Sequence, residues 1–262
     1  MPFETVNNIT FHYEYYGVDN APVVFISGYT CDINLWRPVA DAIETNHKVL
    51  IFDNQGIGKT QDHGETLTVS LMAQNIAKLI QALGIDRAVV VGYAMGSSIA
   101  LQLAHDFPDM VSKLILLSPV LKWSEQAKNL ANRLFKLRQS GQQEAFIQLL
   151  YDCAFGSAFK SKVPLQAFTE MIEGASDVQS IEDQARQLHA LELFNSHSWI
   201  KSLDVPVLVL SPDQDQFATV DDGKAVAEAT LGKQVVIKDC GHAALVEQPD
   251  KLISIIKQEL TH

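Results

Sequence analysis

The sequence predicts an α/β fold in which a mostly parallel central sheet carries helices on both faces. Short apolar runs of strand length alternate along the chain with segments whose apolar residues recur at helical spacing. This alternation is typical of a parallel sheet, and runs that are apolar at almost every position indicate strands buried on both sides. The length of 262 residues fits one large domain of this class with an insertion, or two small domains.

The predicted elements follow one another at short intervals. Residues 3–16 alternate apolar and polar side chains around Asn7-Asn8, which predicts a β-hairpin. A helix is expected over 69–83, because its apolar residues recur every three or four positions and Gly84 follows as a stop signal. The other predicted elements are buried strands at 22–27, 49–53, 89–92, 114–117, 205–210 and 234–238, and a last helix at 249–260.

The stretch 120–200 interrupts this rhythm, because it is helical in composition and lacks convincing strands. It lies between two predicted strands of the sheet. We therefore expect a helical lid over the carboxyl ends of the strands, where open α/β sheets bind ligands. The predicted division is a core of residues 1–119 and 201–262 with a lid of residues 120–200.

Composition narrows the class of partner and the compartment. A net charge of −11 argues against nucleic acid as a partner. The longest apolar runs have strand length, so no membrane span is expected. No signal peptide is expected either, because the first residues, Met-Pro-Phe-Glu-Thr, lack a basic start and an apolar stretch. Three cysteines without CxxC spacing fit reduced thiols. The expectation is a cytoplasmic protein.

Residues 92–96 read Gly-Tyr-Ala-Met-Gly and join a predicted strand to a helical run. This is the context of the G-x-S-x-G nucleophile elbow, in which a sharp turn exposes a serine hydroxyl above the sheet. Ala94 occupies the position of that serine, and a methyl group cannot act as a nucleophile. Ser97 and Ser98 do not replace it, because both fall inside the predicted helix.

Four segments, taken in chain order, resemble the α/β-hydrolase superfamily. Residues 25–29 (Phe-Ile-Ser-Gly-Tyr) are similar to its strand-end His-Gly-x element, and residues 53–60 (Asp-Asn-Gln-Gly-Ile-Gly-Lys-Thr) to its D-x-R-G-x-G-x-S turn. The elbow is the third segment, and the fourth is a late acid followed by a histidine. The departures from the family pattern are Ser27, Gln55, Thr60, Pro212 and Ala94, of which only Ala94 threatens activity.

The resemblance implies a Ser-His-Asp hydrolase mechanism. Asp215 corresponds to the acid and His242, in Asp-Cys-Gly-His-Ala, to the base, in the order expected for this fold. Asp213 follows the same strand and competes with Asp215. The backbone N–H groups of Tyr29 and Met95 would form the oxyanion hole, while the acid holds the histidine in the correct tautomer. We expect no metal and no organic cofactor.

Two explanations for Ala94 stay open: an engineered replacement of serine that traps a substrate, or a natural pseudoenzyme. The presence of Asp215 and His242 favours the first, because an inactive lineage has little reason to keep them. In a comparable triad, loss of the nucleophile lowers turnover by about 10⁶-fold. The chain as given is therefore expected to be inactive.

The predicted lid is basic while the body is acidic. Residues 120–162 carry seven Lys/Arg and three acidic residues, net +4, so the rest of the chain carries −15. If 122–138 is helical, Arg133 and Lys136 share a face. This basic face suits an acidic partner or an acyl chain with a phosphate. It is equally typical of an ordinary amphipathic helix whose polar face meets solvent. Leu130, Leu134 and Leu137 then share another face.

A basic lid on an acidic body is similar to the pimeloyl-[acyl-carrier protein] methyl ester esterases of biotin synthesis. This resemblance implies a carboxylic-ester hydrolase that receives an acidic acyl-carrier protein. The residues expected to bind substrate or partner are Lys122, Arg133, Lys136 and Arg138. The alternatives are a lactonase or C–C bond hydrolase of small metabolites, and a non-catalytic protein that binds ligands in the same pocket.

Overall fold

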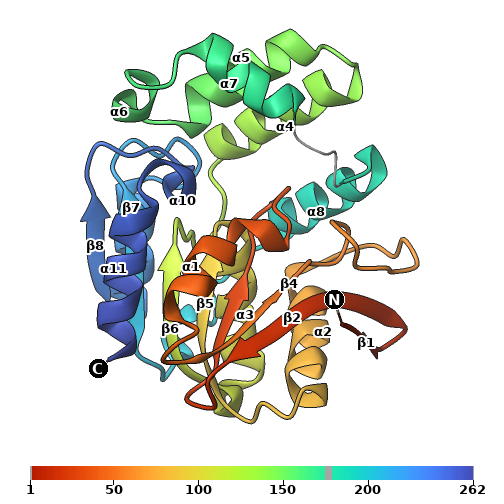
Figure 1. The fold of residues 1–262 in the computed structure, drawn as a ribbon, viewed down its shortest axis with the longest axis vertical. Coiled ribbons are helices and arrows are strands. Elements are labelled where there is room, and N and C mark those ends of the chain that lie inside the picture. The colour runs from red at the N-terminus through yellow and green to blue at the C-terminus, as the bar shows by residue number, and fades with distance from the viewer. Residues whose placement is uncertain (1, 175–178, 262) are drawn as a thin grey trace.

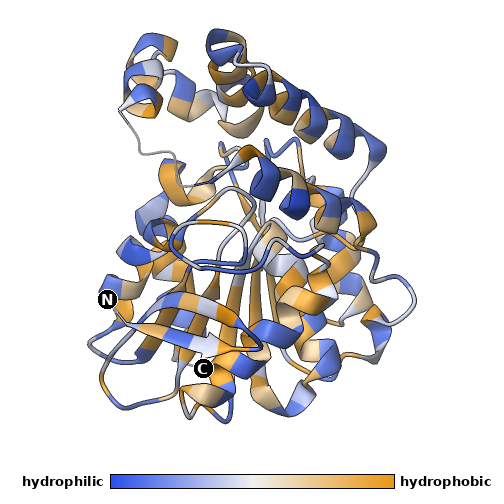
Figure 2. Ribbon diagram, turned by 90° about the vertical axis from the view of Figure 1, so that its right-hand side faces the viewer, coloured by the Kyte–Doolittle hydropathy of each residue, from blue (hydrophilic) through white to orange (hydrophobic). Residues whose placement is uncertain are grey.

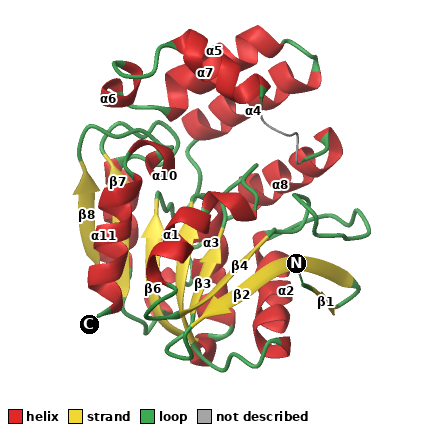
Figure 3. Cartoon of the chain, in the orientation of Figure 1, coloured by secondary structure: helices red, strands yellow, loops and turns green. Residues whose placement is uncertain are grey.

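The computed structural model describes residues 2–174 and 179–261 and arranges eight strands in one sheet, in the order β1-β2-β4-β3-β5-β6-β7-β8 (Figures 1 and 3). Pairing is parallel from β4 to β8 and antiparallel at β1–β2 and β2–β4. The predicted fold class is confirmed. The strands are β1 Phe3–Val6, β2 Ile9–Gly17, β3 Val23–Ile26, β4 Lys48–Phe52, β5 Ala88–Tyr93, β6 Val111–Leu117, β7 Val207–Pro212 and β8 Lys233–Ile237.

Helices separate most of the strands, as the sequence pattern indicates. The two helices predicted individually are confirmed as α2 and α11, and α11 has the predicted bounds. The α-helices are α1 Arg37–Ile43, α2 Val69–Ala82, α3 Met95–Asp106, α4 Glu125–Gln139, α5 Gln143–Ala154, α6 Ser157–Lys160, α7 Leu165–Glu173, α8 Ile181–Leu193, α9 Val220–Ala229, α10 Ala244–Glu247 and α11 Pro249–Leu260. Across the described ranges, none has the length and apolar character needed to cross a bilayer.

The first two strands form the predicted hairpin. Asn7 and Asn8 join them with φ values of 50° and 62°. Two consecutive residues with positive φ are what a two-residue turn of type I′ requires, and asparagine tolerates this conformation better than most residues. The hairpin extends the sheet on its β4 side (Figure 1).

Alternate strand residues face two separate apolar cores. In β3, Val24 packs in the core that α2, α3 and α9 cover, whereas Val23 and Phe25 pack in the core covered by α1 and α11. This follows from the two-residue period of side chains along a strand. Both faces of the sheet are therefore buried at β3, and Figure 2 shows the strands as a mainly apolar interior.

Helices α4 to α8 lie between β6 and β7 in the chain. In space they lie over the carboxyl ends of the parallel strands (Figure 1). They are called the α4–α8 segment below. Its inner side chains form a third apolar cluster, which includes Leu134, Tyr151 and Phe168 and also receives Phe217 from the loop after β7. The division into core and lid stays a prediction. Residues 175–178 of the predicted lid, and residues 1 and 262 of the predicted core, lie outside the described residues.

Candidate active site

The turn between β5 and α3 holds Ala94 in a strained conformation. Its φ of 50° and ψ of −109° are rare for a residue with a side chain, and such strain persists only where the surroundings enforce it. Here the N–H of Ala94 donates to the carbonyl oxygen of Leu117 at 2.9 Å, and its own carbonyl accepts the N–H of Ser97 at 3.0 Å. Ala94 is partly exposed although its chain neighbours are buried, so its methyl group is not sealed in the core.

The two glycines of this turn are needed for steric reasons. A Cβ on Gly92 would lie 2.5 Å from the carbonyl oxygen of Gly96, and a Cβ on Gly96 would overlap the carbonyl oxygen of Ile26. Both obstacles are backbone atoms, which cannot move aside as a side chain can. Strand β3, strand β5 and helix α3 therefore meet without a spacer at this turn.

We expect Gly96→Ala to lower the free energy of unfolding by about 3 kcal/mol, because a methyl group has no room beside Ile26. The measurement is urea denaturation followed by circular dichroism. The matched control is Gly64→Ala, which also changes a glycine but meets no atom within 4 Å. The control should still lose about 1–2 kcal/mol, because the φ of 73° at residue 64 is left-handed and unfavourable for alanine. Equal costs for the two variants would contradict the steric explanation.

The serines that follow the turn are not available as nucleophiles. The hydroxyl of Ser97 is buried and donates to the carbonyl oxygens of Gly92 and Leu117, at 2.8 and 2.9 Å. Ser98 is also buried, in the first turns of α3. Neither side chain reaches the exposed side of the turn, as the sequence indicates.

The structure brings Asp215 and His242 together from the loops after β7 and β8. The Nδ1 of His242 lies 2.8 Å from Oδ2 of Asp215. The other carboxylate oxygen accepts the backbone N–H groups of Phe217 and Ala218, at 2.8 and 3.0 Å. Burial acts to raise the pKa of Asp215, but the positive charge of His242 and these hydrogen bonds hold it below its usual value. The acid is therefore anchored as a carboxylate that accepts from the imidazole.

Asp213, the competing candidate for the acid, points elsewhere. Its Oδ1 accepts the backbone N–H of Cys240 at 3.3 Å, and its Oδ2 lies 3.6 Å from Nζ of Lys238. The geometry thus pairs Asp215 with His242, while Asp213 contacts the turn that follows β8.

Ser118 is a site residue that sequence reasoning missed. It follows β6 with a φ of 54°, and its hydroxyl donates to Oδ2 of Asp215 at 2.7 Å. The residue is 97 positions from its partner in the chain. The available signal was its place at the carboxyl end of a buried strand, next to the strand that carries the acid.

Aromatic rings locate His242 next to the turn. The ring of Tyr93 lies 5.2 Å from the imidazole, and its hydroxyl donates to the carbonyl oxygen of His242 at 3.1 Å. The ring of Phe217 lies 4.8 Å from the imidazole on the acid loop. Because Tyr93 directly precedes Ala94 in the chain, the imidazole and the nucleophile position share one neighbourhood.

The predicted oxyanion donors have free backbone N–H groups. Within the described residues, neither Tyr29 nor Met95 donates its backbone N–H to a protein acceptor. Met95 is the first residue of α3, whose N–H has no partner within the helix. The other donor, Tyr29, follows Gly28. A Cβ on Gly28 would lie 2.9 Å from the ring of Tyr93, so glycine at this position lets the segment of Tyr29 lie close to that ring.

The cysteines near these loops do not supply a substitute nucleophile. Burial raises the pKa of Cys31 to about 12, and it also raises the pKa of Cys240. Both side chains therefore remain thiols at neutral pH, and the thiolate is the reactive form of cysteine.

The four predicted basic residues divide into two groups. Lys122, Arg133 and Lys136 are exposed. Arg138 instead points towards α8, where its guanidinium donates to Oε1 of Gln184 at 2.6 Å. Helix α4 begins at Glu125, after an N-cap at Ser124, so the supposed helix over 122–138 was too long at its start. Lys122 forms a β-bridge with Asn195 instead.

A buried seam of glutamines joins α8 to the core, and no motif in the sequence indicated it. The Nε2 of Gln187 donates to the carbonyl oxygen of Gln55 at 2.8 Å, and its Oε1 accepts from Gln179 at 2.9 Å. Gln179 also donates to the carbonyl oxygen of Gly56 at 2.7 Å. The seam fixes α8 against the loop that follows β4, near the segment that carries Tyr29.

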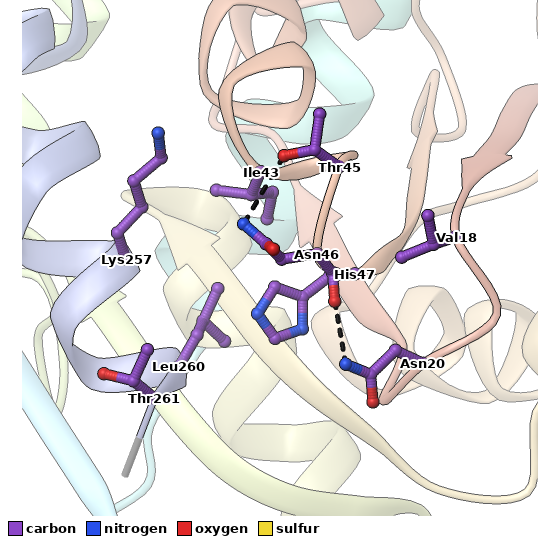
Figure 4. A pocket seen from close by; sticks show the side chains of 9 residues that line it. All are labelled: Val18, Asn20, Ile43, Thr45, Asn46, His47, Lys257, Leu260 and Thr261. Carbon is purple, nitrogen blue, oxygen red and sulfur yellow. Dashed lines mark hydrogen bonds between the residues drawn. The ribbon is translucent and has the colours of Figure 1, made fainter.

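Two hollows on the described part of the surface are lined by residues other than the predicted site residues. Throughout residues 2–174 and 179–261, no group of three or more His, Cys, Asp and Glu side chains could hold a metal ion. One hollow, of about 600 Å³, lies around His47 and Lys257 (Figure 4). It lies where β4 begins, whereas Asp215 and His242 follow the ends of β7 and β8.

Comparison with known proteins places this chain in a family. A family model of the α/β hydrolase fold matches residues 21–249. "Putative carbamate hydrolase RutD" of Rhizobium rhizogenes is 23% identical over 92% of this chain and 94% of its own, and 3-oxoadipate enol-lactonase 1 of Acinetobacter baylyi is 24% identical over 91% and 88%. The crystal structure of MGS-M2, an α/β hydrolase from a Medee basin deep-sea metagenome library, has a TM-score of 0.90 at 20% identity and covers 100% of this chain and 98% of that one. The chain belongs to the α/β-hydrolase fold family.

Proposed function

We propose that the site is that of a carboxylic-ester hydrolase of small molecules in which alanine occupies the nucleophile position. The observation that carries the proposal is the Asp215–His242 pair beside the strained turn at Ala94. A turn of this geometry exposes the side chain of its central residue. An anchored carboxylate on an imidazole nitrogen is the arrangement that makes histidine an effective base.

The steps follow from these positions once a hydroxyl stands at residue 94. The hydroxyl loses its proton to His242 and attacks the acyl carbonyl, while the N–H groups of Tyr29 and Met95 stabilise the oxyanion. The imidazolium then returns the proton to the departing alcohol, and water releases the acyl group in a second cycle. The methyl group of Ala94 cannot take the first step, so we expect the chain as given to show no turnover by this route.

The relatives support a hydrolase of small molecules. The two curated relatives described above are named as a carbamate hydrolase and an enol-lactonase. Identity of 23–24% leaves the acyl group and the leaving group open. The test is therefore the variant Ala94→Ser with short p-nitrophenyl esters, and its expected result opens the Discussion.

An acyl group on an acidic carrier protein is the second candidate substrate, and pimeloyl-acyl-carrier protein methyl ester is its specific form. The observation that favours it is the exposure of Lys122, Arg133 and Lys136 on and beside α4. Arg138 does not join this surface, because its guanidinium hydrogen-bonds Gln184 and the carbonyl oxygen of Gln179.

We expect the double reversal Arg133→Glu and Lys136→Glu to weaken binding of this carrier-protein ester by about tenfold, since each exposed ion pair contributes about 0.2–1 kcal/mol. Added salt should weaken binding to the original chain in the same direction. The measurement is isothermal titration calorimetry with the unmodified Ala94 protein. The control reverses Lys78 and Lys224, two exposed lysines on α2 and α9. Affinity that is insensitive to salt and to the α4 reversals would count against a carrier protein.

A further inference from the structure

Glu247 lies at the end of α10, five positions after His242, and its carboxylate joins two distant parts of the backbone. Oε1 accepts the N–H of Gly241 at 2.9 Å, and Oε2 accepts the N–H of Gly156 at 3.0 Å. Gly241 directly precedes His242, while Gly156 lies between α5 and α6 of the α4–α8 segment. One side chain thus connects the loop of the base to the helices over the sheet.

The two backbones are in direct contact where the carboxylate joins them. A Cβ on Gly241 would lie 2.6 Å from the nitrogen of Gly156 and 2.7 Å from the carbonyl oxygen of Ala154. On the other side of His242, the N–H of Ala243 donates to the same carbonyl oxygen of Ala154 at 2.9 Å. The residues on both sides of the histidine are therefore fixed to the α5–α6 junction.

The acid loop is attached to the same junction. The side chain of Gln214 accepts the N–H of Ser157 at 2.7 Å and donates to its hydroxyl at 3.2 Å. The backbone N–H of Gln214 donates to the carbonyl oxygen of Cys240 at 2.8 Å. The loops of the acid and of the base and residues 154–157 consequently form one hydrogen-bonded unit.

The carboxylate of Glu247 occupies this unit in spite of an electrostatic cost. Burial raises its pKa, and the N–H groups of Gly156 and Gly241 act in the opposite direction. Without the carboxylate, both N–H groups would lose their acceptor in a half-buried place, which is unfavourable for each of them. A neutral amide in its place could accept one N–H but would direct a donor at the other.

We propose that Glu247 is a positioning residue, whose carboxylate fixes the loop of His242 against the α5–α6 junction and so sets the orientation of the imidazole toward Asp215 and position 94. The inference rests on the proposed function for its consequence in catalysis. Its structural part concerns the unmodified chain. Glu247 touches no reacting atom and acts through the backbone of Gly241 and His242.

The structural part is tested by NMR on the unmodified Ala94 protein, labelled with ¹⁵N in its histidines. The probe is the low-field proton on Nδ1 of His242, which reports the hydrogen bond to Asp215. In Glu247→Gln we expect this signal to move upfield or to be lost to exchange with water. The control is Asp250→Asn, which makes the same charge change at an exposed residue of α11, and its signal should match that of the original chain. An unaltered signal in Glu247→Gln would overturn the proposal.

The catalytic part is tested in the Ala94→Ser background with p-nitrophenyl butyrate. We expect Glu247→Gln to lower kcat by about 10- to 100-fold with little change in KM, because a displacement of about 1 Å in a catalytic group costs about 10²-fold. Glu247→Asp, which keeps the charge, should restore part of the loss. Equal rates with and without the carboxylate would also overturn the proposal. If Ala94→Ser itself is inactive, the proposed function fails while the NMR result still decides the role of Glu247.

Discussion

Replacement of Ala94 by serine is expected to raise kcat for p-nitrophenyl acetate and butyrate by about 10⁶-fold, which corresponds to about 8 kcal/mol of activation barrier. The turn already has the required backbone, with a φ of 50° at Ala94, and its side chain is partly exposed. The substitution therefore adds one oxygen atom and requires no rearrangement. The measurement is the initial rate of p-nitrophenolate release, together with a burst that equals the enzyme concentration.

Two further variants separate the hydroxyl from other effects of the change. Ala94→Gly alters the same position without a nucleophile and should remain inactive. Ala94→Ser combined with His242→Gln should lose almost all of the gain, because residues that act as a unit are not additive. If Ala94→Ser folds normally but shows no esterase, lactonase or thioesterase activity, the proposal fails and a non-catalytic ligand-binding protein becomes the better interpretation.

In the Ala94→Ser background, Asp215→Asn is expected to lower kcat by about 10⁴-fold. The carboxylate now accepts from Nδ1 of His242 at 2.8 Å, whereas an asparagine amide can donate to that nitrogen and favour the wrong tautomer. The imidazole would then present a proton, and not a lone pair, to the hydroxyl at position 94. The measurement is kcat with p-nitrophenyl butyrate.

The matched control for this prediction is Asp213→Asn, two positions away on the same loop. Asp213 contacts the N–H of Cys240 and the ammonium of Lys238 but not the imidazole. We expect the kcat of Asp213→Asn to stay within a few-fold of that of Ala94→Ser alone, because Asp213 supports only the structure of the loop. A similar loss in both variants would mean that the loop as a whole, and not the acid at 215, supports catalysis.

The order of strands and helices could be predicted because buried strands leave a strong local signal. Continuous apolar runs located β3, β4, β5, β7 and β8 to within two residues. Strand β6 begins at Val111, three residues earlier than predicted, because Ser112 and Lys113 interrupt the apolar run where the pairing with β5 shifts register. Apart from the supposed helix over 122–138, the individual helices of the α4–α8 segment were not predicted, since helical composition alone gives no boundaries. Ser124 could have marked the true start of α4, as serine is a preferred N-cap.

Residues that belong to a motif were easier to place than those that support it. The pairing of Asp215 with His242 agrees with the geometry because both lie in short segments with a recognisable pattern. Ser118 and Gln187 contact residues about 97 and 132 positions away in the chain. Serine and glutamine are ordinary residues with many roles, so only tertiary structure could reveal these contacts.

The basic residues of the predicted lid show the limit of helical periodicity. Spacing at 100° per residue describes the faces of α4, but it does not say which face another helix covers. Arg138 faces α8 and hydrogen-bonds Gln184, whereas Arg133 and Lys136 stay at the surface. Residue type alone gave all three the same role.

Attachment of the α4–α8 segment at two places limits how a substrate can enter. One attachment is at Gln187 on α8, which binds the loop after β4, and the other is at Gly156, which Glu247 binds. A segment tied at two points cannot swing away as a rigid flap on one hinge. The two ties therefore limit how far the helices beside them can move away from the sheet. We therefore expect the largest accepted molecule to depend on these ties as well as on the shape of the space above Ala94.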